Sequence, residues 1–426
     1  MKFGMRYGAN FLTYLITSLY AILTFIIPRF IENKTLIYDV LIAEDGFYIN
    51  CYNSKPILEC LVEGYRGWLH VPSMIISAII YQFPIQDWAI LNFLFHMILL
   101  ALFACLTYFS LNQLIKSRVE SLLLTLIIFS NPLLQIESIH QTAALYTYMI
   151  IPLIVSVLRV NLKKTNFLIA LILIPASVTW QFDTFFLATI VVAIILKQFV
   201  ISKRTASLVI VYIMSLIVVL MSNNLEEASS RILNLRVSMV TESINSVLTL
   251  IPMLGLGEDW PYMSSPNQTF NSNYITLVTS ITFIAFCFLS IKHIKKLYLS
   301  SSKSIQIIRD ITILVVLYQL CIILFLQSAA RNVAVFQTLL ILLIYLKFKQ
   351  KRNFRLRYLG IVLFVYSMLS MNQVDKLKSH ISWTEQVNAN QLICQKENND
   401  FDVTFYLPIA SIANMTMHCD DLNLNR

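Results

Sequence analysis

The stretch WAILNFLFHMILLALFACLTYFSL, residues 88–111, contains no Lys, Arg, Asp or Glu and is apolar along most of its length. A helix needs about 20 predominantly apolar residues to cross the hydrocarbon core of a bilayer. The stretch is long enough, so we expect it to form a membrane-spanning helix.

Ten further apolar runs are each bounded by charged or polar residues, which is the pattern of additional spans. They lie at residues 11–31, 119–134, 143–158, 166–181, 184–201, 206–222, 273–291, 311–327, 332–346 and 358–371. The whole chain of 426 residues is 57% hydrophobic and only 13% charged, with a mean hydropathy of +0.70. This composition excludes an ordinary water-soluble enzyme, a disordered protein and a disulfide-rich miniprotein. The sequence therefore predicts an all-α polytopic membrane protein with about 11 transmembrane helices.

The charges between these runs predict the orientation, because cytoplasmic loops of membrane proteins are enriched in Lys and Arg. With a cytoplasmic N-terminus, 21 of the 32 Lys and Arg residues lie on the cytoplasmic side, together with only Glu120 and Asp310 of the 23 acidic residues. The net charge of +9 then divides into a basic cytoplasmic face and an acidic outer face. It indicates contact with lipid headgroups and no nucleic-acid partner.

Three segments on the outer side are long enough to hold a functional site. They are a first loop (32–87), a middle loop (223–272) and a C-terminal tail (372–426) that follows the transmembrane domain (1–371). A twelfth apolar run, Val71–Pro84, is short for a span, and a crossing there would invert every later loop. We predict that it forms an amphipathic or re-entrant helix at the outer surface.

Four cysteines lie on the predicted outer side, where disulfides persist. Cys51 and Cys60 share the first loop, and Cys394 and Cys419 share the tail. The simplest pairing joins the two cysteines of each segment, although four cysteines also allow other pairings. The alternative is that one or both pairs stay reduced.

The acids Glu44 and Asp45 follow the first span and precede Gly46. Two adjacent carboxylates repel each other, so one of them can have a raised pKa and serve as a general base. The pair could instead hold a divalent cation such as Mg or Mn through its oxygens, or be two solvated acids in a loop. Gly46 would let the backbone turn directly after them and present both acids at the membrane surface.

The first loop continues with Gly64-Tyr65-Arg66-Gly67-Trp68-Leu69-His70-Val71-Pro72. Together with Glu44-Asp45-Gly46, this stretch resembles bacterial polytopic glycosyltransferases of the GT-C fold. Within that class it is most similar to the serotype-converting glucosyltransferases that modify the O-antigen of lipopolysaccharide. The resemblance implies inverting transfer of a hexose, with glucose as the expected one, from an undecaprenyl-phosphate-type donor. The acceptor would be a hydroxyl of a cell-surface polysaccharide or lipid-linked glycan, on the periplasmic face of the inner membrane.

The same resemblance implies that Glu44 or Asp45 is the catalytic base, which takes the proton of the acceptor hydroxyl. The departing lipid phosphate needs positive charge nearby, and the candidates on the outer side are Arg66, His70 and Arg331. Arg331 lies in a tight turn between the ninth and tenth spans, where it could bind a phosphodiester in a bidentate way. It could also simply extend to the interface without a ligand, and His70 could be an ordinary interfacial histidine.

Sugar recognition needs aromatic faces and polar side chains. All five tryptophans fall on the predicted outer side. An aromatic belt accounts for Trp88 and Trp180, which leaves Trp68, Trp260 and Trp383 as candidates for stacking on sugar rings. The predicted sugar- and acceptor-binding residues are Tyr65, Trp68, Glu137, His140, Asp183 and Trp260. The ionisable members of this set could equally be ordinary loop residues.

Two other functions fit a polytopic protein of glycan assembly. A lipid-linked glycan flippase or another transporter usually carries charges within its spans or pairs of broken helices, and the predicted spans show neither. An O-antigen polymerase would concentrate arginines in its outer loops, whereas the only basic residues of the middle loop are Arg231 and Arg236.

Overall fold

The computed structural model of the chain describes ten segments: residues 2–32, 38–41, 43–62, 71–130, 148–159, 163–178, 202–221, 382–396, 402–406 and 415–423. It also describes the isolated positions 311, 313, 338, 339, 342, 345 and 346. This part of the chain is mostly helical, as the sequence predicts. Within it, one helix, Ile85–Ile115, is long and apolar enough to cross a membrane, and two shorter apolar helices are Phe11–Thr24 and Lys164–Ala176.

Six described helices overlap predicted spans. They are α1 (Lys2–Glu32), α5 (Trp88–Ile115), α6 (Arg118–Phe129), α8 (Ile150–Leu158), α9 (Lys164–Val178) and α11 (Lys203–Met221). The predicted spans 184–201, 273–291 and 358–371 lie outside the described residues, as do most residues of 311–327 and 332–346.

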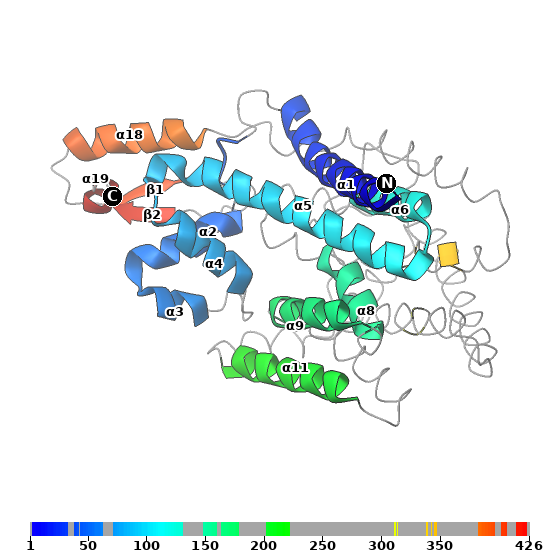
Figure 1. Ribbon diagram of the computed structural model, residues 1–426. Helices are drawn as coiled ribbons and strands as arrows, with labels where there is room; N and C mark the ends of the chain where they lie inside the picture. Colours follow the sequence, from blue (N-terminus) through cyan, green and yellow to red (C-terminus); the bar gives the residue numbers. More distant parts are fainter. Residues whose placement is uncertain are drawn as a thin grey trace, which may run out of the picture.

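Three of these helices pack against α5, and the other two lie further from it, as Figure 1 shows. Helix α5 contacts α1, α6 and α8, while α9 lies between α8 and α11. The residues of α8 from Ile150 to Val157 are buried on every side. By contrast, α1, α5, α9 and α11 expose large apolar side chains, including Phe11, Ile98, Ile172 and Ile210. A surface this apolar favours lipid over water as its surroundings.

The described residues of the first loop form three helices and a 3-10 turn. They are α2 (Ala43–Ser54), α3 (Ile57–Val62), α4 (Val71–Ile80) and η1 (Ile85–Asp87). The expected turn at Gly46 is wrong, because α2 continues through this residue. Asp45, Ile49 and Tyr52 are buried, and their spacing of three or four residues gives α2 one packed face. The predicted surface helix is present as α4, which at 10 residues is too short to cross a bilayer.

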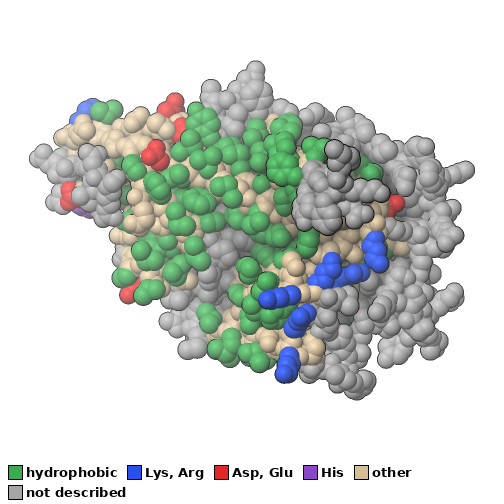
Figure 2. Space-filling model, in the orientation of Figure 1, with side chains coloured by type: hydrophobic (Ala, Val, Ile, Leu, Met, Phe, Trp, Pro, Cys, Tyr) green, Lys and Arg blue, Asp and Glu red, His purple; other side chains and the backbone are tan. Residues whose placement is uncertain are grey.

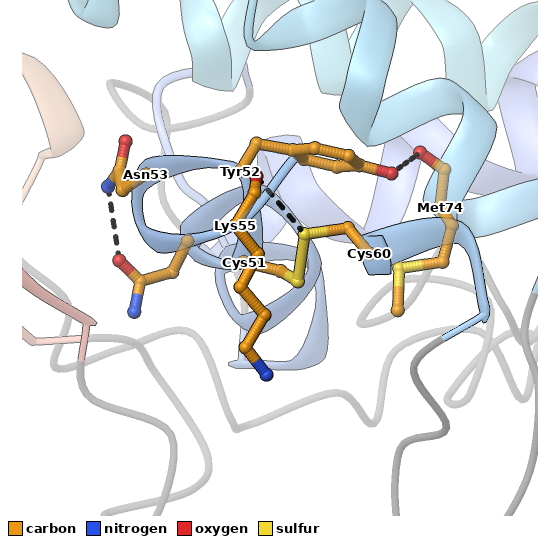
Figure 3. The surroundings of a disulfide bond; sticks show 7 residues. Cys51, Tyr52, Asn53, Lys55, Cys60 and Met74 are labelled. Atoms are coloured by element: carbon orange, nitrogen blue, oxygen red, sulfur yellow. Dashed lines mark hydrogen bonds between the residues drawn. A yellow bond between two sulfur atoms is a disulfide. The ribbon is translucent and has the colours of Figure 1, made fainter. Parts of the chain in front are cut away.

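A disulfide joins the end of α2 to α3, as Figure 3 shows. It links Cys51 to Cys60, whose Cα atoms are 5.8 Å apart. Beside it, the Tyr52 hydroxyl donates a hydrogen bond of 2.7 Å to the Met74 carbonyl oxygen at the start of α4. Burial raises the pKa of the Tyr52 phenol to about 12, so this donor keeps its proton near neutral pH. The disulfide and the hydrogen bond together hold α2, α3 and α4 as one group.

The described residues of the tail form a helix, a two-stranded sheet and a second, short helix. These elements are α18 (Trp383–Lys396), β1 (Asp402–Phe405), β2 (Met415–His418) and α19 (Cys419–Asn423). The strands are antiparallel, with Asp402 opposite His418 and Phe405 opposite Met415. The second disulfide, Cys394–Cys419, ties α18 to the residue that follows β2. Both disulfides have the pairings that the sequence favours as the simplest. Loops of 9 and 25 residues correspond to a stabilisation of about 3 kcal/mol for each disulfide.

The first loop and the tail share one hydrophobic core, although more than 290 residues separate Ile85 from Trp383. This core combines Ile49 of α2, Ile80 of α4 and Trp88 of α5 with Trp383, Phe405 and Met417 of the tail. We call the described residues of 38–89 and 382–423 the loop–tail unit. In Figure 1 it lies around the N-terminal end of α5, at the left.

Trp383 is the centre of this shared core. Its side chain is 1% exposed, its ring stacks on Trp88 with the centroids 6.2 Å apart, and Phe405 lies 4.8 Å away. Its indole N–H donates a hydrogen bond of 2.7 Å to the Ile85 carbonyl oxygen. The indole therefore has both its apolar faces and its single polar group satisfied within the loop–tail unit.

Asp39 fastens the start of α18 to the first loop. Its carboxylate accepts hydrogen bonds from the Ser382 hydroxyl and from the backbone N–H and hydroxyl of Thr384, the latter at 2.8 Å. The backbone carbonyl oxygen of Asp39 accepts a hydrogen bond of 2.9 Å from the backbone N–H of Trp383. The first N–H groups of a helix lack partners within the helix and favour negative charge. An acid distant in sequence therefore acts as the cap of α18.

Candidate functional site

A buried carboxylate links the first loop to α5. Asp45, in the first turn of α2, is 4% exposed, and Asn92, in the second turn of α5, is 8% exposed. The Asn92 side-chain amide donates a hydrogen bond of 2.9 Å to Oδ2 of Asp45. Burying a carboxylate is costly unless polar partners surround it. The hydrogen bond from Asn92 supplies one such partner and fixes the carboxylate against the helix.

The position along α5 sets the depth of this contact. Trp88 is the first residue of α5, and each helical residue advances about 1.5 Å. Asn92 therefore lies about 6 Å along the axis from the start of the helix. His96, one turn further on the same face, is 2% exposed. Polar and ionisable residues buried at such depth in an apolar helix are functional candidates by default.

The divalent cation considered at Glu44 and Asp45 stays a prediction, because the side chain of Glu44 lies outside the described residues. Among the described residues, no group of three or more His, Cys, Asp or Glu side chains could hold a metal ion. What the structure shows is that the Asp45 carboxylate accepts a hydrogen bond from the Asn92 amide.

Most of the other predicted site residues cannot be compared with the structure. Glu44 belongs to α2, but its side chain lies outside the described part of the chain. The residues predicted to bind phosphate, sugar or acceptor also lie outside it, and they are Tyr65, Arg66, Trp68, His70, Glu137, His140, Asp183, Trp260 and Arg331.

Two tryptophans have roles that differ from those expected. Trp383 is not available to stack on a sugar, because Trp88 and Phe405 pack against its buried ring. Trp88, expected in an aromatic belt, is 3% exposed and donates its indole N–H to the Phe83 carbonyl oxygen at 2.9 Å. The tail covers both rings, and a prediction for each helix end alone could not include that contact.

Asn92 and His96 were not among the predicted site residues. The sequence does contain a pattern that indicates them. Within residues 88–111 these two polar side chains stand four residues apart in a run otherwise dominated by Leu, Phe and Ile. Residues at positions i and i+4 share one face of a helix. A search for polar side chains that share one face of a predicted span would have found the pair.

No family model, curated protein or solved structure matches the chain. The function is therefore inferred from the residues of the chain and from their arrangement.

Proposed function

We propose that this protein is a GT-C-type membrane glycosyltransferase with Asp45 as its catalytic base. It would transfer a hexose, glucose by resemblance, from a polyprenyl-phosphate donor to a hydroxyl of a cell-surface polysaccharide such as O-antigen. The transfer would take place on the periplasmic face of a bacterial inner membrane, with inversion at the anomeric carbon. The observation that carries this proposal is the Asp45 carboxylate, buried and hydrogen-bonded to Asn92 where α5 begins.

Two long-range contacts support the proposed topology. Asp39 bonds to Ser382 and Thr384, so the first loop and the tail must lie on the same side of any membrane. The Tyr345 hydroxyl donates a hydrogen bond to the Glu120 carboxylate. These two residues must therefore also lie on one side of any membrane. Each contact needs an even number of crossings between its partners. The proposed arrangement of 11 spans has an even number in both intervals.

The distribution of charge supports the same orientation. The loop–tail unit holds five exposed acids, Glu59, Asp87, Glu385, Asp402 and Asp420, against two exposed bases, Lys55 and Lys396. The exposed bases of the helical region are Lys116, Arg118, Lys163, Lys164 and Lys203, which lie in the turns that the topology assigns to the cytoplasm. Figure 2 shows a broad hydrophobic band, with most of the acidic side chains and one basic side chain towards the left, and a row of basic side chains beyond the band at the lower right. This separation is typical of a protein with a basic inner face.

The chemistry of the site fits a single displacement. A carboxylate close to the acceptor hydroxyl accepts its proton as the oxygen attacks the anomeric carbon, and the lipid phosphate leaves with the bonding electron pair. Because phosphate is a good leaving group, the site needs no strong general acid. In this structure Asp45 is covered, so an acceptor reaches it only when a neighbouring segment moves.

The direct test is the surface polysaccharide of a host strain with and without this protein. We expect its repeat unit to gain the mass of one hexose when the protein is present, and the linkage to be opposite in configuration to that of the donor. Mass spectrometry and NMR of the purified polysaccharide measure both. An identical polysaccharide in the two strains would contradict the proposal.

The membrane setting makes a separate prediction about α4. Ile75 and Ile79 stand four residues apart on α4 and are 47% and 41% exposed, on a helix that contacts α5. A spin label at position 79, in protein whose Cys105, Cys287 and Cys321 are replaced by Ala, should collide more with oxygen than with a water-soluble nickel chelate in vesicles. A label at the exposed Glu385 of α18 should show the reverse. Equal chelate access at both positions would contradict burial of α4 in lipid.

One observation favours a second function, transport of a lipid-linked glycan coupled to protons. His96 is an ionisable residue buried within the apolar helix α5, and such residues also mark proton relays in transporters. A transporter moves its substrate across the membrane of a vesicle without forming a glycosidic bond. Formation of a new hexose linkage by the purified protein separates the two functions.

A further inference from the structure

The hydrogen bond between Asn92 and Asp45 connects two elements of the fold whose residues are 47 positions apart in the sequence. Asp45 belongs to a helix of the first loop, whereas Asn92 belongs to the long apolar helix α5. Both side chains are more than nine-tenths buried, and their atoms are 2.9 Å apart. Because α5 belongs to the one described helix that is long and apolar enough to cross a membrane, its amide is a fixed reference point for a carboxylate on a short helix.

We infer that Asn92 is a positioning residue for the catalytic carboxylate of Asp45. This inference rests on the proposed function and deepens it. The side-chain amide holds Oδ2 and so fixes the plane of the carboxylate relative to α5. A general base must meet the proton of the acceptor hydroxyl at hydrogen-bond distance, and a small misplacement lowers the rate steeply. Asn92 touches neither sugar nor phosphate in this scheme and acts through Asp45.

The charge of the partners explains why an amide suits this position. A Lys or Arg here would form a buried ion pair and hold the proton acceptor in its ionised form. The neutral amide donates one hydrogen bond and adds no charge, so it orients the base without neutralising it. Hydrogen bonds to charged groups contribute more than those between neutral groups. The loss of this one should therefore be measurable.

The test is the variant Asn92→Leu, which has similar volume and no donor, assayed with a polyprenyl-phosphate hexose and the acceptor glycan. We expect kcat to fall by about 10- to 100-fold, while KM for donor and acceptor stays within about twofold. The melting temperature in detergent should stay within a few degrees of that of the wild type. A merely structural role would instead lower the melting temperature or raise both KM values.

Thr107→Val is the matched control, because Thr107 is also fully buried on α5 and its hydroxyl has no hydrogen-bond partner among the described residues. It should leave kcat unchanged. The variant Asp45→Asn separates the two levels of inference. If Asp45→Asn is inactive and Asn92→Leu keeps the wild-type kcat, or loses activity only through KM or stability, the positioning role is overturned and the proposed function stands. If Asp45→Asn is active, the proposed function itself fails.

Discussion

Replacing Asp45 with Asn should abolish sugar addition while leaving the protein folded in the membrane. The asparagine side chain has nearly the shape of aspartate, and its carbonyl oxygen can still accept the hydrogen bond from Asn92. It cannot take a proton from the acceptor hydroxyl. General bases typically contribute about 10²- to 10⁴-fold to the rate, so we expect kcat to fall by at least about 100-fold. The measurement is the hexose content of the surface polysaccharide, or transfer by the purified protein.

Two variants make this result specific. Glu59→Gln alters an exposed acid of the neighbouring helix α3 and should keep full activity. Glu44→Gln tests the other acid of the pair, which lies in the same helix turn as Asp45. Activity close to wild type in both Asp45→Asn and Glu44→Gln would remove the acidic pair from the mechanism.

Replacing Trp383 with Ala should detach the tail from the first loop. Trp383 is buried against Trp88 and Phe405, and its indole donates to the Ile85 carbonyl oxygen. A Trp→Ala change in a core typically costs about 3–5 kcal/mol, and this one also leaves the Ile85 carbonyl without that donor. Hydrogen exchange of the β1 and β2 amides should accelerate by about two orders of magnitude or more. Both disulfides should still form, because neither spans the interface between loop and tail.

The matched control for this change lies on the same helix. Leu392 of α18 is 58% exposed, so Leu392→Ala should leave the exchange of the strand amides unchanged. If Trp383→Ala leaves those amides as protected as in the wild type, the shared core does not hold the tail. In that case the tail is held by the cap at Asp39 or by residues outside the described part of the chain.

Local patterns predicted the elements of the fold better than their contacts. The run at 88–111 matches α5 because an apolar stretch of that length has few alternatives to a helix. Val71–Pro84 contains α4 for a similar reason, although the helix ends at Ile80. The predicted turn at Gly46 was wrong because it rested only on the conformational freedom of glycine. The buried face of α2, with Ile49 and Tyr52, keeps this glycine within the helix.

The candidate site was predictable only in part. The adjacent acids Glu44 and Asp45 drew attention to this part of the first loop, but no sequence pattern indicated that Asn92 would contact Asp45 from another helix. The contacts of Asp39 with Thr384 and of Trp88 with Trp383 join residues that are far apart in the chain. Such pairings depend on how the helices between them pack, which local composition does not encode.

The most direct measurement is sugar transfer by the purified protein in vesicles that contain a polyprenyl-phosphate hexose and a polysaccharide acceptor. The wild-type protein should form one new hexose linkage of inverted configuration and release the lipid phosphate in equal amount. The Asp45→Asn protein, reconstituted at the same level, should form none above the uncatalysed background. A wild-type protein that transfers no sugar from this class of donor, or an Asp45→Asn protein that transfers it at the wild-type rate, would contradict the proposed function.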